Sequence, residues 1–349
     1  MTAKLLIGSA ASHLLLFFCG LVPPGWIETV HARGVFPRLR YLFATPVASV
    51  SFSIVEILLS CGILLAGATL LQLLLPRQSR ISLLPQLLLL LSVLGLHLYL
   101  LGFGWLYKRP PLARRLSLPE LSDQESFAQG ALEAAGAARR LRCQAPEELR
   151  LAELGLLARE AVQAVLPLLD AEPLPASRLK AVWPEGFLLR FGVSGIFSPF
   201  TQETHIDLGI DPVERPFVAA HELAHLAGFA SEDEANFVAW LACSRSEDPW
   251  FRYSGQLAAL RRFHAKAAIG LRKELMAKAG PDVLADWRRA AERRGSHRSV
   301  PLSKINRWAY DKLLRSQGVE EGIRSYDAVT RLMLAWRAHI LRGAPSRER

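Results

Sequence analysis

The chain has 349 residues and a formal net charge of +10, and its composition is 51% hydrophobic and 21% charged. This length allows more than one domain, and a globular enzyme alone would not need so much leucine. The positive charge does not indicate nucleic acid as a partner, because no aromatic stacking array or recognised nucleic-acid module accompanies the arginine-rich helices.

Three long apolar runs occupy the first third of the chain, at residues 5–22, about 47–75 and about 83–105. Each has roughly the length of a helix that crosses a bilayer, so the pattern predicts three transmembrane helices in a membrane domain of residues 1–109. A cleaved signal peptide is the alternative for the first run, but no Ala-x-Ala site follows Val22. The two later runs predict a membrane anchor, and hence the lipid bilayer as a partner, under either interpretation.

The segment between the first two runs, residues 23–45, mixes aromatic side chains such as Trp26 and Tyr41 with arginines. This mixture is typical of the headgroup region and predicts an interfacial helix or loop. The positive-inside rule compares the number of basic residues on the two sides of the membrane. One side carries Arg33, Arg38, Arg40, Lys108, Arg109, Arg114 and Arg115, and the other carries Lys4, Arg77 and Arg80. The count favours a cytoplasmic C-terminal domain, whereas a signal-like first helix favours the opposite side, so the orientation stays open.

The second predicted domain spans residues 110–349 and begins at the Pro110-Pro111 pair, which marks a boundary. Helical patterns fill it up to about Leu169 and again after Cys243. Short strand patterns lie between them, at residues 179–182, 187–191 and 203–208. We therefore expect a mainly α, α+β domain with a small sheet.

The most informative motif is His-Glu-Leu-Ala-His at residues 221–225. One helical turn separates His221 from His225, so both imidazoles project from the same face toward one point. Zinc bound by neutral imidazoles and one carboxylate keeps an open position and lowers the pKa of a bound water to about 7. Glu222 is then placed to accept the proton of that water and pass it to a leaving amine, as a general base.

A third protein ligand is expected among the acidic residues that follow the motif. Ser231 is a predicted N-cap of a second helix, and Glu234 at its third position completes a capping box. We predict Glu232 as the ligand, with Glu234 in reserve and Asn236, one turn later, as a hydrogen-bond partner for a histidine. A surface helix that merely carries two histidines is the alternative, and the acidic cluster disfavours it.

The two-part pattern HExxH…ExxAN resembles the zincin metallopeptidases, in particular their gluzincin-like branch, and this resemblance implies Glu232 as the third zinc ligand. Residues 192–209 and 216–237, with the apolar segments ahead of them, resemble the bacterial membrane protein family called domain of unknown function 3810. That family is itself only a predicted zinc peptidase, so the resemblance implies a zincin-like fold in a multi-pass protein of the bacterial inner membrane.

Two further expectations come from the zincin resemblance. Zincins use the edge strand of a small sheet to pair with extended substrate, and residues 204–208 are the candidate for that strand. They also commonly use a tyrosine or histidine outside the motif to stabilise the oxyanion. Tyr326 and Tyr310 are the candidates, and Tyr326 lies in the part that resembles the family.

The sequence thus predicts a membrane-anchored zinc metallopeptidase that hydrolyses peptide bonds of a peptide or protein substrate, with Zn²⁺ as cofactor. The alternative is a non-catalytic membrane scaffold whose zinc only joins the two helices, with Asp233 or Glu234 as a fourth ligand. A protease active inside the bilayer is disfavoured, because the helix from Pro216 is short and bordered by charged residues.

Overall fold

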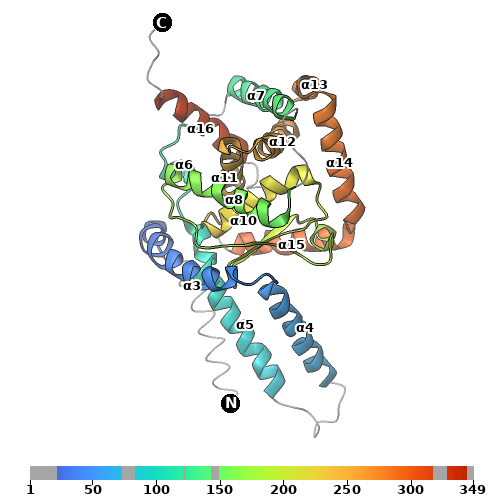
Figure 1. Cartoon of the computed structure of the whole chain (residues 1–349). Helices are drawn as coiled ribbons and strands as arrows, with labels where there is room; N and C mark the ends of the chain where they lie inside the picture. Colours follow the sequence, from blue (N-terminus) through green and yellow to red (C-terminus); the bar gives the residue numbers. More distant parts are fainter. Residues whose placement is uncertain (1–21, 73–82, 121–122, 143–148, 317–327, 344–349) are drawn as a thin grey trace.

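The computed structural model describes residues 22–72, 83–120, 123–142, 149–316 and 328–343, and most of them are helical (Figure 1). Before the sheet, the elements in chain order are α2 Pro24–Trp26, the π-helix η1 Ile27–Val35, α3 Phe36–Ala48, α4 Ile54–Gln72, α5 Leu83–Gly102, the 3₁₀ helix η3 Gly104–Lys108, α6 Leu112–Arg115, α7 Gln124–Arg142, α8 Leu151–Val165 and the 3₁₀ helix η4 Leu166–Leu169. From the sheet onward they are β1 Leu179–Ala181, α9 Phe187–Arg190, β2 Gly195–Ser198, β3 Glu203–Ile206, the 3₁₀ helix η5 Pro212–Glu214, α10 Arg215–Leu226, α11 Glu232–Arg245, α12 Pro249–Lys266, α13 Ile269–Ala279, α14 Pro281–His297, α15 Val300–Ser316 and α16 Val329–Gly343.

Helices α10 and α11 form the centre of the large helical body. Both pack against α8 on one side and α12 on another, and α7 packs in turn against α12 and α13. Fully buried alanines, among them Ala220 on α10 and Ala235 and Ala239 on α11, line these contacts. Small side chains let helix axes approach closely, so the two central helices are held rigidly by their neighbours.

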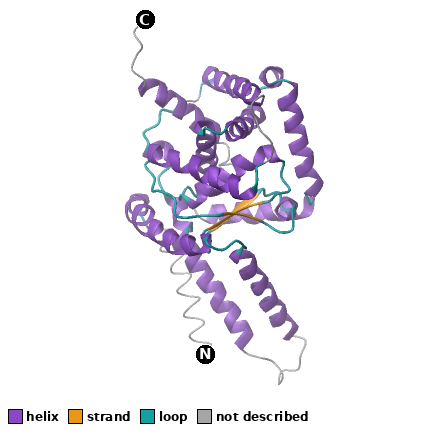
Figure 2. Ribbon diagram, viewed as in Figure 1, coloured by secondary structure: helices purple, strands orange, loops and turns teal. Residues whose placement is uncertain are grey.

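The predicted small sheet is confirmed, with strand order β1-β3-β2. β1 pairs with β3 in parallel, and β2 pairs with β3 antiparallel, with Phe197 opposite Thr204. The central strand is therefore β3, which corrects the expectation that residues 204–208 form an edge strand. Within the described residues the edge nearest α10 belongs to β2, and Figure 2 shows the strands at the end of the body from which α4 and α5 project.

Residues 187–191, expected as a strand, contain the short helix α9 instead. The buried Asp207 carboxylate, from just beyond β3, accepts hydrogen bonds from the main-chain N–H groups of Gly186 at 2.7 Å, Leu188 at 2.8 Å and Leu189 at 3.3 Å. A carboxylate at these positions satisfies the free N–H groups of a helix start. This cap comes from a distant part of the chain, so the local strand pattern could not reveal it.

The expectation of three transmembrane helices is wrong. Among the described residues, α4 is the one helix that is long and apolar enough to cross a membrane. In the third run, Gln86–Gly102 of α5 is a shorter apolar helix. The chain then turns into η3, and Phe103 and Leu106 are buried in the body. The first run, residues 5–22, lies almost wholly outside the described residues.

The start of α4 is joined to the sheet by buried polar groups. The Glu203 carboxylate accepts hydrogen bonds from the main-chain N–H groups of Ile54 at 2.9 Å and Val55 at 2.8 Å. Lys180 of β1 donates to Glu203 Oε1 at 2.5 Å and to the Phe52 carbonyl at 2.7 Å. A carboxylate at a helix N-terminus and a buried counter-ion stabilise each other, so α4 is anchored directly on the sheet.

The predicted interfacial segment, residues 23–45, folds as α2, η1 and most of α3, and its arginines bind within the protein. Arg40, only 1% exposed, donates to the carbonyls of Leu226 at 3.1 Å and Pro173 at 2.6 Å. Burial lowers the pKa of Arg40 to about 10. Because Leu226 is the last residue of α10, this arginine neutralises the C-terminal end of the motif helix.

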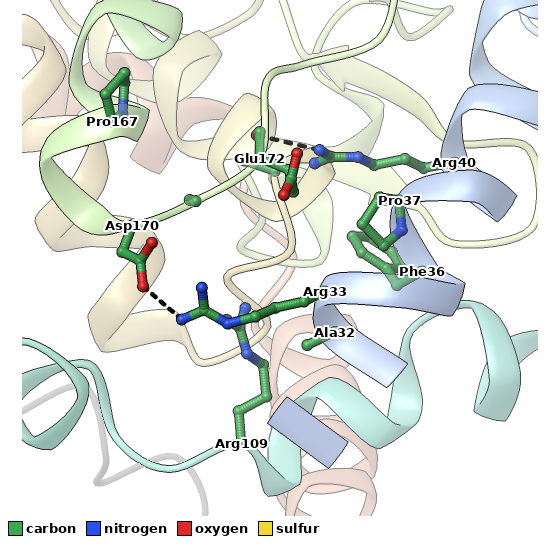
Figure 3. Close-up of a pocket in the computed structure, with 11 residues that line it drawn as sticks. Ala32, Arg33, Phe36, Pro37, Arg40, Arg109, Pro167, Asp170 and Glu172 are labelled. Atoms are coloured by element: carbon green, nitrogen blue, oxygen red, sulfur yellow. Dashed lines mark hydrogen bonds and ion pairs between the residues drawn. The ribbon is translucent and has the colours of Figure 1, made fainter. Parts of the chain in front are cut away.

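A cavity of about 150 Å³ lies beside this contact, lined by Arg33, Arg40, Arg109, Asp170 and Glu172 among others. Figure 3 shows Arg33 directed at Asp170, and these two form an ion pair at 2.6 Å. Arg109 pairs with Glu28 at 2.7 Å and donates to the Gly228 carbonyl at 3.1 Å. The arginines therefore have partners inside the protein, and we interpret this cavity as part of the packing behind α10.

Candidate metal centre

The motif helix α10 begins and ends as its residue types predict. Pro216 occupies its first turn, and Gly228 adopts the left-handed conformation with φ +98°. The Gly228 N–H donates to the His225 carbonyl at 2.9 Å, and the Phe229 N–H donates to the Ala224 carbonyl at 3.1 Å. A left-handed glycine turns the chain sharply after a helix, and here it brings α11 back across the motif.

Three side chains meet where α10 and α11 face each other: His221, His225 and Glu232. The two Nε2 atoms are 3.2 Å apart, His221 Nε2 is 3.2 Å from Glu232 Oε2, and His225 Nε2 is 3.8 Å from Glu232 Oε1. We call these three residues the candidate metal centre. They form a group whose ligand atoms all lie within 4.8 Å of one another.

These separations suit zinc. Bonds of 2.0–2.2 Å in a tetrahedron place neighbouring ligand atoms about 3.3–3.6 Å apart, close to the distances observed. His225 Nδ1 lies 2.8 Å from the Phe229 carbonyl, and a donated N–H there leaves the lone pair of Nε2 facing the other two ligands. His221 Nδ1 is buried with no hydrogen-bond partner in the described part of the chain. The donor set therefore fits a divalent metal with one open position.

Glu234, the reserve ligand, is engaged elsewhere. Its carboxylate accepts hydrogen bonds from the Leu112 N–H at 2.6 Å and from Arg115 at 3.0 Å. The predicted capping box is therefore not formed, and the Ser231 hydroxyl donates to Asp233 instead. Glu234 fastens α11 to the start of α6 and points away from the candidate metal centre.

Asn236 also differs from its predicted role. Its amide donates to the Glu232 carbonyl at 2.6 Å, and its oxygen accepts from Arg262 of α12. It therefore contacts the main chain at Glu232 and not a histidine ring. The amide links the first turn of α11 to α12 and so fixes the position from which the Glu232 side chain projects.

The charges of the three ligands are strongly coupled. Burial opposes protonation of His221, but the hydrogen bond and charge of Glu232 outweigh burial and raise the His221 pKa. Burial and the neighbouring His221 lower the pKa of His225 to about 4. Burial opposes ionisation of Glu232 as well, but its hydrogen bond to His221 and the two histidines lower its pKa to about 2. The negative charge of Glu232 therefore favours the protonated form of His221 over that of His225.

Glu222 lies on α10 but outside the ligand set, against strand β2. Burial raises its pKa to about 8, and the charge of His221 and a hydrogen bond with the Phe197 main chain act in the opposite direction. A Cβ atom built at Gly195 would lie 2.6 Å from Glu222 Oε1 and 2.8 Å from the His205 carbonyl oxygen. Only glycine leaves room here for the carboxylate.

The main-chain groups of β2 that face this carboxylate follow from the register. The Asp207 N–H donates to the Ser194 carbonyl at 2.9 Å, so Ser194 belongs to a hydrogen-bonded pair of the antiparallel ladder. Such pairs alternate, and the N–H and C=O groups of Gly195 and Phe197 therefore point away from β3. β2, with the sequence GIFS, was not among the predicted strands, and it supplies this edge beside Glu222.

Tyr310 of α15 reaches the candidate metal centre, and its hydroxyl donates to Glu232 Oε1 at 2.6 Å. It is one of the two tyrosines that the sequence offered as oxyanion donors. Tyr326, the other, lies outside the described residues, so its predicted role stays a prediction.

The fold and the site together define a mainly helical protein with one helix able to cross a membrane and a His₂Glu cluster beside a three-stranded sheet. The family described as "Protein of unknown function (DUF3810)" matches residues 31–334, and the chain belongs to this family. This confirms the family resemblance, and the match includes α10, α11 and the candidate metal centre. No curated protein and no solved structure is significantly similar to the chain.

Proposed function

We propose that the protein is a zinc-dependent peptidase, of the zincin-like kind, anchored in the cell membrane by α4. The observation that carries this proposal is the placement of Glu222. Three ligand atoms form one open metal site, while a fourth side chain, which a structural site would not need, lies beside them against the outward edge of β2.

A zinc ion held by His221, His225 and Glu232 would supply Lewis acidity to an incoming water and to the substrate carbonyl. Glu222 accepts the proton of the attacking water and delivers it to the leaving amine. The outward N–H and C=O groups of Gly195 and the C=O of Phe197 pair with an extended peptide, while the Phe197 N–H is held by Glu222. Tyr310 is close enough to Glu232 to donate instead to an oxyanion formed next to the ligands.

The scaffold alternative receives no support from the residues it needs. A closed structural site requires a fourth protein ligand, and Asp233 and Glu234 were the candidates. Asp233 accepts a hydrogen bond from Ser231, and Glu234 is bound to Leu112 and Arg115. In the part of the chain that the structure describes, the metal-ligating group contains three residues.

Membrane anchoring is supported by the exposure of α4. Its apolar window, with a mean hydropathy of 2.3, is not buried inside the protein at all. A core helix of a soluble protein would be covered by its neighbours, so lipid is the environment that suits this surface. The side of the membrane on which the helical body lies stays a prediction.

Metal analysis of the detergent-purified protein tests the ligand set. We expect one equivalent of zinc in the wild type and in Glu234→Ala, and loss of zinc in Glu232→Ala. Glu222→Gln should keep its zinc while turnover of a peptide library falls by roughly 10²–10⁴-fold, the usual contribution of a general base. A wild type that binds no zinc, or a Glu222→Gln variant with full turnover, would contradict the proposal.

A further inference from the structure

Large aromatic side chains are exposed around the start of α4. Phe52, two residues before the helix, is 59% exposed, and Trp183 is 82% exposed. The Trp183 N–H donates to Glu56 Oε1, in the first turn of α4, at 3.2 Å. Phe200, 42% exposed, packs on Tyr99 of α5 with ring centroids 6.4 Å apart. We call Phe52, Trp183 and Phe200 the aromatic rim.

The position of the aromatic rim matches a change in exposure along both apolar helices. On α4, Ile57 and Leu58, one turn past Phe52, are 49% and 54% exposed. On α5, Leu98 is 39% exposed, whereas Leu100 is 1% exposed. Single exposed aromatic residues are common on soluble proteins, but several at the level where apolar helices leave the body are typical of a membrane–water interface.

The candidate metal centre is close to this level. Phe103 directly follows α5, and its ring centroid is 6.0 Å from that of His225 and 5.1 Å from that of Phe197 on β2. The five positions from Leu98 to Phe103 correspond to about 8 Å of helical rise. The residues of the candidate metal centre therefore lie on the order of 15 Å from the exposed apolar part of α5, measured along the helix and across one ring contact.

We propose that the aromatic rim lies in the headgroup region of the bilayer, and that the candidate metal centre acts on the membrane-proximal segment of an anchored polypeptide. The second half of this inference rests on the proposed peptidase function. An extended chain advances about 3.3 Å per residue, so on the order of 15 Å corresponds to roughly five residues. The scissile bond is expected within roughly five residues of the end of the substrate's membrane span.

The first experiment measures lipid contact with a nitroxide label, using the full chain in phosphatidylcholine nanodiscs. Cys19, Cys61 and Cys143 are replaced by serine, the fully buried Cys243 is kept, and the label is placed at Trp183→Cys or Phe52→Cys. The matched control is Ile269→Cys, because Ile269 is also apolar and 74% exposed but lies on α13, far from α4 and α5 (Figure 1).

Labels on the aromatic rim should be relaxed more strongly by oxygen, which partitions into lipid, than by a water-soluble nickel chelate. The label at position 269 should show the reverse. If the labels at 183 and 52 respond like the label at 269, the rim is in water and the inference is overturned. This result does not depend on catalysis, so it decides the membrane contact even if the protein is not a peptidase.

The second experiment uses three substrates that carry one identical cleavable sequence. It is placed directly after a single membrane span, or at the end of a long Gly/Ser linker from the same span, or in a free peptide. In nanodiscs that hold both enzyme and span, the membrane-proximal substrate should be cleaved at least about tenfold faster than the linker-extended one. Equal rates would overturn the substrate class while leaving the peptidase function intact, whereas cleavage of none by the zinc-loaded protein would refute the peptidase function itself.

Discussion

Replacing Gly195 by alanine is the most specific perturbation of the proposed mechanism that the structure offers. The new Cβ would lie 2.6 Å from Glu222 Oε1 and 2.9 Å from Glu222 Cγ, distances that non-bonded carbon atoms do not tolerate. It would also lie 2.8 Å from the His205 carbonyl oxygen, which belongs to the central strand and cannot yield. The carboxylate moves because it is the end of a flexible side chain, and β2 has to shift away from the His205 carbonyl as well.

The expected result is a separation of metal binding from catalysis. The metal ligands are untouched by the added methyl group, so zinc content should stay at the wild-type level. Turnover should fall by roughly 10²–10⁴-fold, as for loss of a general base, and stability should fall by about 1–3 kcal/mol, as for an overpacked core. Zinc analysis, peptide turnover and thermal unfolding on the same preparation measure all three quantities.

The matched control is Gly270→Ala on α13, where an added Cβ meets nothing within 4 Å. Alanine is the better helix former, so this variant should keep full activity and gain stability by up to about 1 kcal/mol. If Gly195→Ala turns over substrate as the wild type does, Glu222 is not the base or does not lie against β2. If the variant loses zinc as well, the methyl group also disturbs the candidate metal centre, which contradicts the described geometry.

Two further predictions concern stability at the contact between α4 and the sheet. Lys180→Met leaves the Glu203 carboxylate, which is 2% exposed, without its buried counter-ion. We therefore expect the free energy of unfolding to fall by about 3–5 kcal/mol and the midpoint of thermal unfolding to be clearly lower. The control Arg337→Met removes a surface ion pair and should change little. A midpoint equal to that of the Arg337 variant would contradict the anchoring role. Burial lowers the pKa of His205 to about 4. The unfolded chain therefore binds a proton at this residue near pH 6.5, whereas the folded chain does not. Stability should fall by up to about 3 kcal/mol as the pH drops from 7 toward 4. His205→Gln should reduce this pH dependence in thermal unfolding, and an unchanged dependence would mean that other groups cause it.

The meeting of His221, His225 and Glu232 in one cluster could be predicted from the sequence because their arrangement is almost entirely local. His221 and His225 are separated by one helical turn, and a left-handed Gly228 returns the chain within a few residues to present Glu232. A helix, a turn and a second helix leave little freedom in how these side chains meet. The role of Glu234 was misassigned because its partners, at Leu112 and Arg115, are more than a hundred positions away in sequence.

The sheet was predictable in outline but not in order. Its strands are three or four residues long, too short for an alternating pattern to distinguish an edge strand from a central one. Residues 205–208 alternate polar and apolar side chains as a half-exposed strand does, yet all residues of β3, including the polar Thr204 and His205, are buried. The edge strand nearest α10, β2, contains a glycine that lowers its strand propensity and that Glu222 makes necessary.

The membrane part shows why hydropathy and charge counts were least reliable. An apolar run reports only how many residues avoid water, and it does not say whether lipid or protein covers them. Leu100 and Phe103 are covered by protein, so the third run ends earlier as a candidate span than its composition suggests. The charge count has the same weakness. Arg40 is buried against main-chain carbonyls and Arg109 is paired with Glu28, so neither is free to interact with headgroups. With such charges removed, the excess that favoured a cytoplasmic body shrinks.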